Sequence, residues 1–214
     1  MYKRQIQDAS PLLGEQVIIF GQGIVGLLLT SILSNYPLVD LISVDPISER
    51  RKASLLAGAK SSYSPERWLE VSEESRGRNE VNDADLAFEV SGVPDALNLA
   101  ISAVGFDGRV VIGSWYGTKP VELDLGGRFH RDRIQIISSQ VSTIQPGLRG
   151  RWTKARRIET VLELIQQIAP ARWITHRVPF NQAPEGYRLL DKSPDKVLQL
   201  ILTYDSPGEA GQVA

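Results

Sequence analysis

The segment IIFGQGIVGLLLTSIL, residues 18–33, decides the fold of this chain, because it joins two apolar runs through three closely spaced glycines. Residues 17–20 are β-branched or aromatic and stop at the first glycine, which predicts a buried strand. Residues 24–34 are apolar almost all round, which predicts a well-buried helix. A strand that turns directly into a helix is typical of the start of a βαβ unit.

The same alternation continues along the chain. Residues 64–85 are polar and predict a helix followed by a surface loop. Near-continuous apolar strands that alternate with helices predict an α/β fold. The predicted fold is a Rossmann-like doubly wound parallel sheet of about six strands with helices on both faces, followed by a C-terminal return segment. The expected strands are 17–20, 41–44, 60–63, 86–90, 109–112, 134–138 and 197–203, and the expected helices are 24–34, 48–57, 94–104, 153–168 and 183–190.

The glycines form the pattern G-x-G-x-x-G at Gly21, Gly23 and Gly26. In a dinucleotide-binding turn, the first glycine permits a tight turn and the second lets the backbone approach a pyrophosphate. The third lets the helix pack closely on the strand. The helix N-terminus then offers N–H groups to the phosphates. The pattern alone is a weak signal, but its place between a predicted strand and a predicted helix strengthens it.

An acidic residue follows the second predicted strand. Asp45 lies roughly 20 positions after Gly26, where a carboxylate can bind the ribose hydroxyls of adenosine. An acid would repel a 2′-phosphate, so the sequence favours NAD, with NADP less favoured. Arg50 and Arg51 keep NADP open, since a nearby arginine accommodates that phosphate. The plain alternative is a glycine turn beside a solvated Asp45.

The composition narrows the chemistry. The 214 residues are 42% hydrophobic and 23% charged, with a formal net charge of −1, so no overall field favours nucleic acid or a membrane surface. The chain has no cysteine, which excludes disulfides and thiolate catalysis and fits a cytoplasmic protein. No stretch approaches the roughly 18 apolar residues of a membrane helix, and residues 1–15 lack the apolar core of a signal peptide.

Five segments in order resemble the medium-chain dehydrogenase/reductase superfamily, in its zinc-type alcohol and polyol dehydrogenase branch. They are GEQVIIFGQGIVG, LISVDPISERRKASLLAGA, DLAFEVSGVPDALNLAI, GRVVIGSWYG and WITHRVPFNQAPEGYRLLD. The resemblance covers about residues 14–204, but only the dinucleotide-binding, C-terminal domain of that superfamily. Its cysteine, histidine and glutamate zinc ligands, which lie in the N-terminal catalytic domain, have no counterparts here, so the resemblance implies no zinc in this chain.

The resemblance also implies a division of the chain. Residues 1–14 would be the remnant of a domain-joining helix, 15–170 the dinucleotide-binding domain, 171–204 the return segment and 205–214 a disordered tail. The chain would be a fragment or a split subunit that is not catalytically competent alone. Its expected partners are a separate catalytic-domain chain and a second copy in a homodimer.

Matching positions of the resemblance give a cofactor site, whereas the catalytic residues stay unknown. The glycine-rich turn would hold the pyrophosphate, Asp45 the adenosine ribose, and Arg50 would flank the adenine. The pair after the fourth strand would line the middle of the cofactor. The pairs after the fifth and sixth strands would face the nicotinamide amide. The implied residues are Gly21, Gly23, Ile24, Val25, Gly26, Asp45, Arg50, Ser91, Gly92, Gly113, Ser114, Ser138 and Ser139.

Other features have two interpretations each. His130 could be a proton shuttle, although a loop histidine is favoured, and His176 is expected to anchor a turn. The basic run 149–157 could contact nucleic acid, but a solvated helix start or closure over a cofactor phosphate is favoured. Trp115 and Tyr116 could wall the nicotinamide pocket or face a catalytic domain.

Two other functional classes stay open. The first is a non-catalytic, NAD-sensing binding module. The second is a degenerate fragment without function, which predicts an exposed apolar patch formed by Trp173, Ile174, Val178 and Phe180.

Overall fold

The computed structural model describes residues 2–77 and 83–204. The expected tail 205–214 and residues 78–82 of the expected surface loop lie outside this part. The chain divides into two compact units, Met1–Ile168 and Ala169–Ala214.

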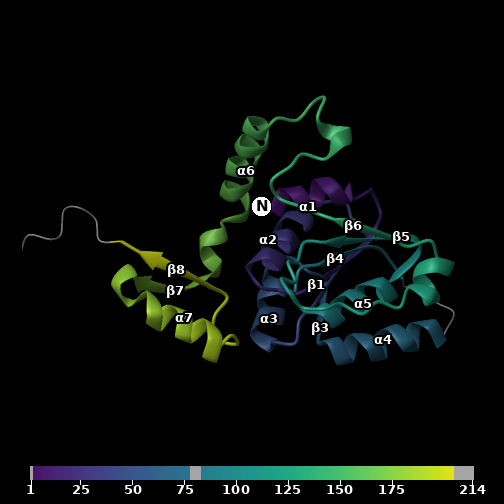
Figure 1. The fold of residues 1–214 in the computed structure, drawn as a ribbon, viewed down its shortest axis with the longest axis horizontal. Coiled ribbons are helices and arrows are strands. Elements are labelled where there is room, and N and C mark those ends of the chain that lie inside the picture. Colours follow the sequence, from purple (N-terminus) through teal and green to yellow (C-terminus); the bar gives the residue numbers. More distant parts are fainter. Residues whose placement is uncertain (1, 78–82, 205–214) are drawn as a thin grey trace, which may run out of the picture. The chain divides into compact units, whose positions relative to one another are not determined.

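The first unit is built on a parallel sheet with the strand order β3-β2-β1-β4-β5-β6 (Figure 1). The chain therefore winds outward from β1 in one direction and then, from β4, in the other. This confirms the predicted doubly wound, Rossmann-like α/β fold. The strands are β1 (Gln16–Phe20), β2 (Asp40–Val44), β3 (Ser61–Tyr63), β4 (Ala84–Glu89), β5 (Val104–Ile112) and β6 (Gln135–Ser138).

Helices cover both faces of this sheet. In Figure 1, α1 and α2 lie on one side of the strands and α4 and α5 lie on the other. Short helical turns follow the strands β5 and β6. The helices are α1 (Tyr2–Ala9), α2 (Ile24–Leu33), α3 (Ser48–Leu56), α4 (Pro65–Gly77), α5 (Pro94–Ala103) and α6 (Lys154–Ile168), and the turns are η1 (Leu125–Phe129) and η2 (Pro146–Leu148).

Two apolar cores follow from the alternation of side chains along each strand. In β1, Val17 and Ile19 pack into a core with residues of α1, α2 and α6. Ile18 and Phe20 point to the opposite face and pack with residues of α4 and α5. These four side chains are at most 2% exposed. The near-continuous apolar strands thus reflect burial on both faces, as the sequence predicts.

The strand β5 begins earlier than predicted, at Val104 instead of residue 109. Its first half carries Phe106, which is 72% exposed, and Asp107, whose φ is +59°. The pairing with β4 also shifts register between Ala84 and Leu86. The sequence indicated only the buried half of this strand because the first half lacks an apolar pattern.

The second unit holds a two-stranded parallel sheet and one long helix. Its elements are η3 (Pro170–Trp173), β7 (Ile174–Pro179), η4 (Phe180–Gln182), α7 (Ala183–Lys192) and β8 (Gln199–Thr203). The strand β7 was not predicted, and the expectation of a turn at His176 was wrong. Half-buried and exposed residues alternate along β7, which is the period of a strand with one covered face.

The expected exposed patch in this unit is only partly present. Trp173 is buried at 4% exposure, so its inclusion in the patch was wrong. Phe180 is 53% exposed and stacks on Tyr204 with 4.8 Å between ring centroids. The guanidinium of Arg172 lies over the indole of Trp173, 4.4 Å from the ring centroid.

No helix in residues 2–77 and 83–204 is both long enough and apolar enough to cross a membrane.

Leucine truncation tests the packing of the first unit. Leu29 of α2 is fully buried, so Leu29→Ala should lower the free energy of unfolding by about 2–5 kcal/mol. Leu56, at the end of α3, is 75% exposed, and Leu56→Ala should change it by less than about 0.5 kcal/mol. Urea unfolding of both variants measures the difference. Equal losses would contradict the assigned core.

Candidate functional site

The candidate site lies where the carboxyl ends of the parallel strands meet. In doubly wound sheets, ligands bind outside these ends, at the point where the strand order reverses. Here that point lies between β1 and β4, which pair with each other. The later strands are added outward from β1 on one side and from β4 on the other. Residues of the predicted site directly follow or end four of the strands: Gly21 after β1, Asp45 after β2, Gly113 after β5 and Ser138 at the end of β6.

The three glycines of the turn have different surroundings. Gly21 has a φ of +95°, and a Cβ there would lie 2.6 Å from the Cα of Ser91. A Cβ on Gly26 would lie 1.9 Å from the carbonyl oxygen of Gly21. A Cβ on Gly23 would meet nothing within 4 Å. The outer glycines are thus required by close packing, whereas the middle one leaves open space beside the backbone.

The same turn begins helix α2. Gly23 is the N-cap and supplies no side-chain hydrogen bond to the helix. Ile24 and Val25 are the first helical residues, and the first turn carries no acidic side chain. Uncapped N–H groups and the positive end of the helix dipole favour an anion here. An open, uncapped helix start beside Gly23 therefore fits the pyrophosphate of a dinucleotide.

Asp45 is joined to this turn by hydrogen bonds. Its Oδ2 accepts from the backbone N–H of Gln22 at 2.7 Å, and its Oδ1 accepts from that of Ile47 at 2.8 Å. The side chain is only 3% exposed, so Asp45 is not the solvated residue of the plain alternative. A carboxylate oxygen can accept more than one hydrogen bond, so both oxygens retain acceptor capacity for hydroxyl groups.

Two side chains near Asp45 are also held by hydrogen bonds. Gln22 is fully buried and accepts a 3.0 Å hydrogen bond from the Thr30 hydroxyl through Oε1. Arg51 donates from Nη1 to the carbonyl oxygens of Asp45 and Pro46, both at 2.8 Å. Arg50 lies half-buried on α3. The turn after β2 is thus held by side chains from both of its ends.

On the other side of the switch point, one buried acid joins the loops after β4 and β5. Glu89 Oε1 accepts from the backbone N–H and the hydroxyl of Ser91, at 2.8 and 2.5 Å. Its Oε2 accepts from the hydroxyl of Tyr116. The backbone N–H of Gly92 donates to the Ser114 hydroxyl at 2.8 Å. These bonds bring the predicted residues Ser91, Gly92 and Ser114 together.

Sequence reasoning missed Glu89 and Tyr116 as a pair. The available signal was an acid at the end of an otherwise apolar strand, since glutamate is almost never fully buried without a partner. Burial raises the pKa of the Tyr116 hydroxyl above its usual value, and the hydrogen bond to Glu89 raises it further. Tyr116 therefore stays a neutral donor across the physiological range.

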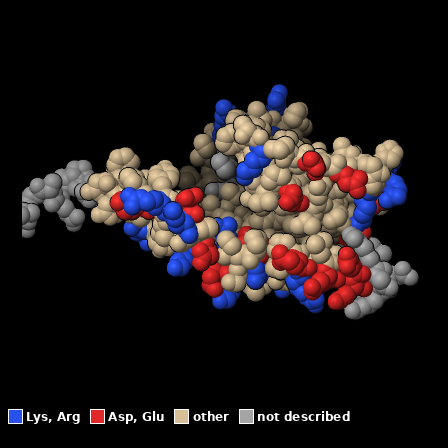
Figure 2. Space-filling view, turned by 60° about the horizontal axis from the view of Figure 1, so that its bottom comes forward, with Lys and Arg blue, Asp and Glu red and all other residues tan. Residues whose placement is uncertain are grey.

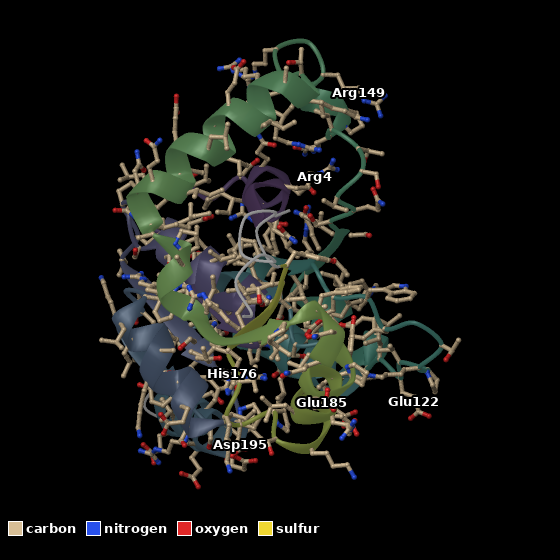
Figure 3. All side chains as sticks on the ribbon, turned by 90° about the vertical axis from the view of Figure 1, so that its left-hand side faces the viewer. Arg4, Glu122, Arg149, His176, Glu185 and Asp195 are labelled. Atoms are coloured by element: carbon tan, nitrogen blue, oxygen red, sulfur yellow. The ribbon has the colours of Figure 1, made fainter. Side chains whose placement is uncertain are left out.

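A third polar group lies at the end of β6. Ser139 donates from its hydroxyl to Asp8 Oδ2 at 2.8 Å, and its N–H donates to the carbonyl oxygen of Ile112 at 2.9 Å. Asp8 also pairs with Arg4 of α1 at 2.5 Å (Figure 3). Arg4 donates onward to the Thr143 hydroxyl at 3.2 Å. Helix α1 thus ties down the loop after β6, while Ser138 itself is exposed.

His130 does not join this group. It is exposed, directly follows η1 and precedes β6, so it lies toward the amino end of that strand. The site lies at the carboxyl ends, so the loop interpretation of His130 is favoured over a proton shuttle. Trp115 is 90% exposed beside the anchored Tyr116.

Three arginines of the basic run bind backbone carbonyl oxygens of residues 141–151. Arg156 donates to the carbonyl oxygen of Arg151 at 2.6 Å, and Arg157 donates to that of Thr143 at 3.1 Å. Arg149, on the loop before α6 (Figure 3), donates to the carbonyl oxygen of Ile144 at 3.2 Å. On the face shown in Figure 2, Lys and Arg side chains are interspersed with Asp and Glu. These arginines therefore hold the backbone of the segment between β6 and α6.

Within residues 2–77 and 83–204, no group of three or more His, Asp or Glu side chains is arranged to hold a metal ion.

This chain is similar to known dehydrogenases over most of its length. Two curated relatives, D-guloside 3-dehydrogenases of Escherichia coli K12 and Shigella flexneri, are each 24% identical over 202 residues. The match covers 93% of this chain and 57% of each relative, so the chain spans little more than half the length of those proteins.

Solved structures share the fold. Zinc dependent alcohol dehydrogenase 2 from Streptococcus pneumonia, in its apo form, superposes with a TM-score of 0.78 and 25% identity, over 96% of this chain and 56% of that one. A short chain alcohol dehydrogenase from Escherichia coli CFT073, complexed with NADH, gives 0.76 and 19%, over 94% and 57%.

The profile of a family described as zinc-binding dehydrogenase matches residues 25–165. This stretch runs from the first turn of α2 into the last turn of α6 and so contains most of the six-stranded unit. The chain therefore belongs to the zinc-binding dehydrogenase family.

Proposed function

We propose that this chain is the NAD-binding domain of a zinc-type alcohol or polyol dehydrogenase-like oxidoreductase. The observation that carries the proposal is the open space at Gly23 between two glycines that close packing requires. It lies at an uncapped helix start, and the Asp45 carboxylate is hydrogen-bonded to the same turn. Pyrophosphate and ribose are the two groups that such a pair recognises.

The residues divide the proposed cofactor between them. The N–H groups at the start of α2 would bind the pyrophosphate, and the Asp45 oxygens would accept from the adenosine ribose. A 2′-phosphate would meet this carboxylate, so we propose NAD over NADP. The loops after β4, β5 and β6 would then face the nicotinamide half, across the switch point. When bound, the nicotinamide ring supplies hydride-transfer chemistry.

The relatives support this class of reaction. The matched structures include an alcohol dehydrogenase complexed with NADH and an L-idonate 5-dehydrogenase from Escherichia coli. The curated relatives are D-guloside 3-dehydrogenases. Each name describes an oxidoreductase acting on a hydroxyl-bearing compound, so we propose an alcohol or polyol as the substrate class of the whole enzyme.

We further propose that catalysis needs a catalytic domain, on the same chain or on a separate one. The resemblance assigns the zinc ligands to that domain. We also propose a homodimer, because β6 lies at an edge of the sheet and its outer side is unpaired within the described residues. We propose a cytoplasmic location because the cysteine-free sequence fits a reducing compartment.

Cofactor titration tests the binding proposal. Tryptophan fluorescence of the 214-residue chain should report saturable NADH binding, with weaker binding of NADPH. Asp45→Ala should weaken NADH binding about tenfold or more, because a charge-assisted hydrogen bond to the ribose is lost. Preference for NADPH would contradict the assigned role of Asp45.

Asp85→Ala is the matched control for this titration. Asp85 accepts a 2.8 Å hydrogen bond from the N–H of Gln16, so it also holds the backbone of β1, but at the amino ends of the strands. Its loss should leave NADH affinity within about twofold of the parent. Thermal unfolding of both variants without cofactor shows whether Asp45→Ala acts merely by loosening the turn.

Turnover tests the second half of the proposal. The purified 214-residue chain, mixed with NAD and simple alcohols or polyols, should form almost no NADH by absorbance. Addition of zinc should not change this, because the proposed ligands belong to the catalytic domain. Sustained turnover by the chain alone would refute the assignment of catalysis to that domain.

A further inference from the structure

Glu89 is an unusual residue for its position. It ends β4, whose neighbouring residues Ala87 and Phe88 belong to the two apolar cores. Its side chain is fully buried, with 0% exposure. Burying a carboxylate is costly unless hydrogen bonds replace its water, so its partners indicate why it is there.

The side chain of Glu89 accepts three hydrogen bonds from two different loops. Two come from the backbone N–H and the hydroxyl of Ser91, in the loop between β4 and α5. The third comes from the Tyr116 hydroxyl, in the loop after β5. Hydrogen bonds to a charged group are stronger than neutral ones, so the carboxylate is a firm clamp between these loops.

The main chain of Glu89 adds to the clamp. Its carbonyl oxygen accepts from the N–H groups of Gly113 and Ser114, at 2.9 and 3.2 Å. The Ser114 hydroxyl in turn accepts from the N–H of Gly92, at 2.8 Å. Lys119 donates to the carbonyl oxygen of Gly92 at 3.1 Å. One residue therefore fixes the backbone on both sides of this part of the site.

This part of the site is the half away from Asp45. Asp45 follows β2, on one side of the switch point, and the clamped loops follow β4 and β5, on the other. A dinucleotide that crosses the switch point with its adenosine at Asp45 places its nicotinamide ring over the clamped loops. The groups that Glu89 orders would thus meet the nicotinamide ring, which is the part of the cofactor that ADP-ribose lacks.

We propose that Glu89, acting through Ser91 and Tyr116, is a positioning residue for the nicotinamide ring of the cofactor. The proposal rests on the proposed NAD-binding function. Glu89 itself makes no contact with the cofactor. It sets the shape of the two loops that do, and the adenosine half does not depend on it.

Two variants separate this role from simple stabilisation. Glu89→Gln keeps the shape of the side chain but replaces one acceptor oxygen with an NH₂ donor. Tyr116→Phe keeps the ring and leaves Glu89 Oε2 without its hydroxyl partner. Glu122→Gln is the matched control, since Glu122 (Figure 3) is an exposed glutamate in the stretch after β5.

The experiment compares two ligands on the 214-residue chain. NADH carries both halves of the cofactor, whereas ADP-ribose lacks the nicotinamide ring. Glu89→Gln and Tyr116→Phe should each weaken NADH binding about tenfold and leave ADP-ribose binding within about twofold. They should also reduce the emission change of NADH at saturation, which reports the surroundings of its ring. Glu122→Gln should match the parent in all three measurements.

Every other outcome overturns either this proposal or the proposed function. Equal loss of NADH and ADP-ribose affinity in both variants would show that Glu89 merely supports the fold, and unchanged affinities would show that the clamp has no role in binding. Both results overturn this proposal while leaving the proposed function intact. Failure of the folded parent to bind ADP-ribose overturns the proposed function itself. If Glu89→Gln does not fold, Tyr116→Phe alone carries the comparison.

Discussion

The close approach of the first strand and the first long helix is the constraint on which the rest of the structure depends. The carbonyl oxygen of Gly21 occupies the place where a side chain on Gly26 would begin. This contact aims the start of α2 at the carboxyl edge of the sheet and leaves the backbone at Gly23 accessible. It also fixes Gln22, whose N–H binds Asp45 and so joins β1 to β2. Packing of the core and recognition at the site therefore use the same few atoms.

Much of the fold could be predicted because burial on both faces leaves a plain apolar pattern. The strands β1, β2 and β4 and the helices α2 and α5 lie within a few residues of their expected bounds. Elements that are partly exposed were harder to predict. The first half of β5 carries the exposed Phe106, and β7 has three polar residues in succession, with His176 in the middle. Their strand character comes from pairing with a neighbour, which a local pattern does not record.

The candidate site likewise has a part that the sequence predicted and a part that it did not. The glycine turn and Asp45 could be predicted because their spacing is local and each sits next to a predicted element. The partners of Glu89 and Asp8 could not, since Tyr116 and Ser139 are far away in the sequence and meet them only in the folded chain. A buried acid in an apolar strand does signal a partner, but it does not say which residue that partner is.

The small second unit has a thermodynamic consequence. Its two paired strands, one α-helix and two short turns bury little apolar surface, and a sheet of two strands is marginal by itself in water. The six-stranded unit has two cores to stabilise it. We therefore expect two cooperative units, with amide hydrogens of β7 and β8 exchanging through low-energy opening and those of β1 and β4 only through global opening. The chain would then melt in two steps, and a single transition temperature would not describe it.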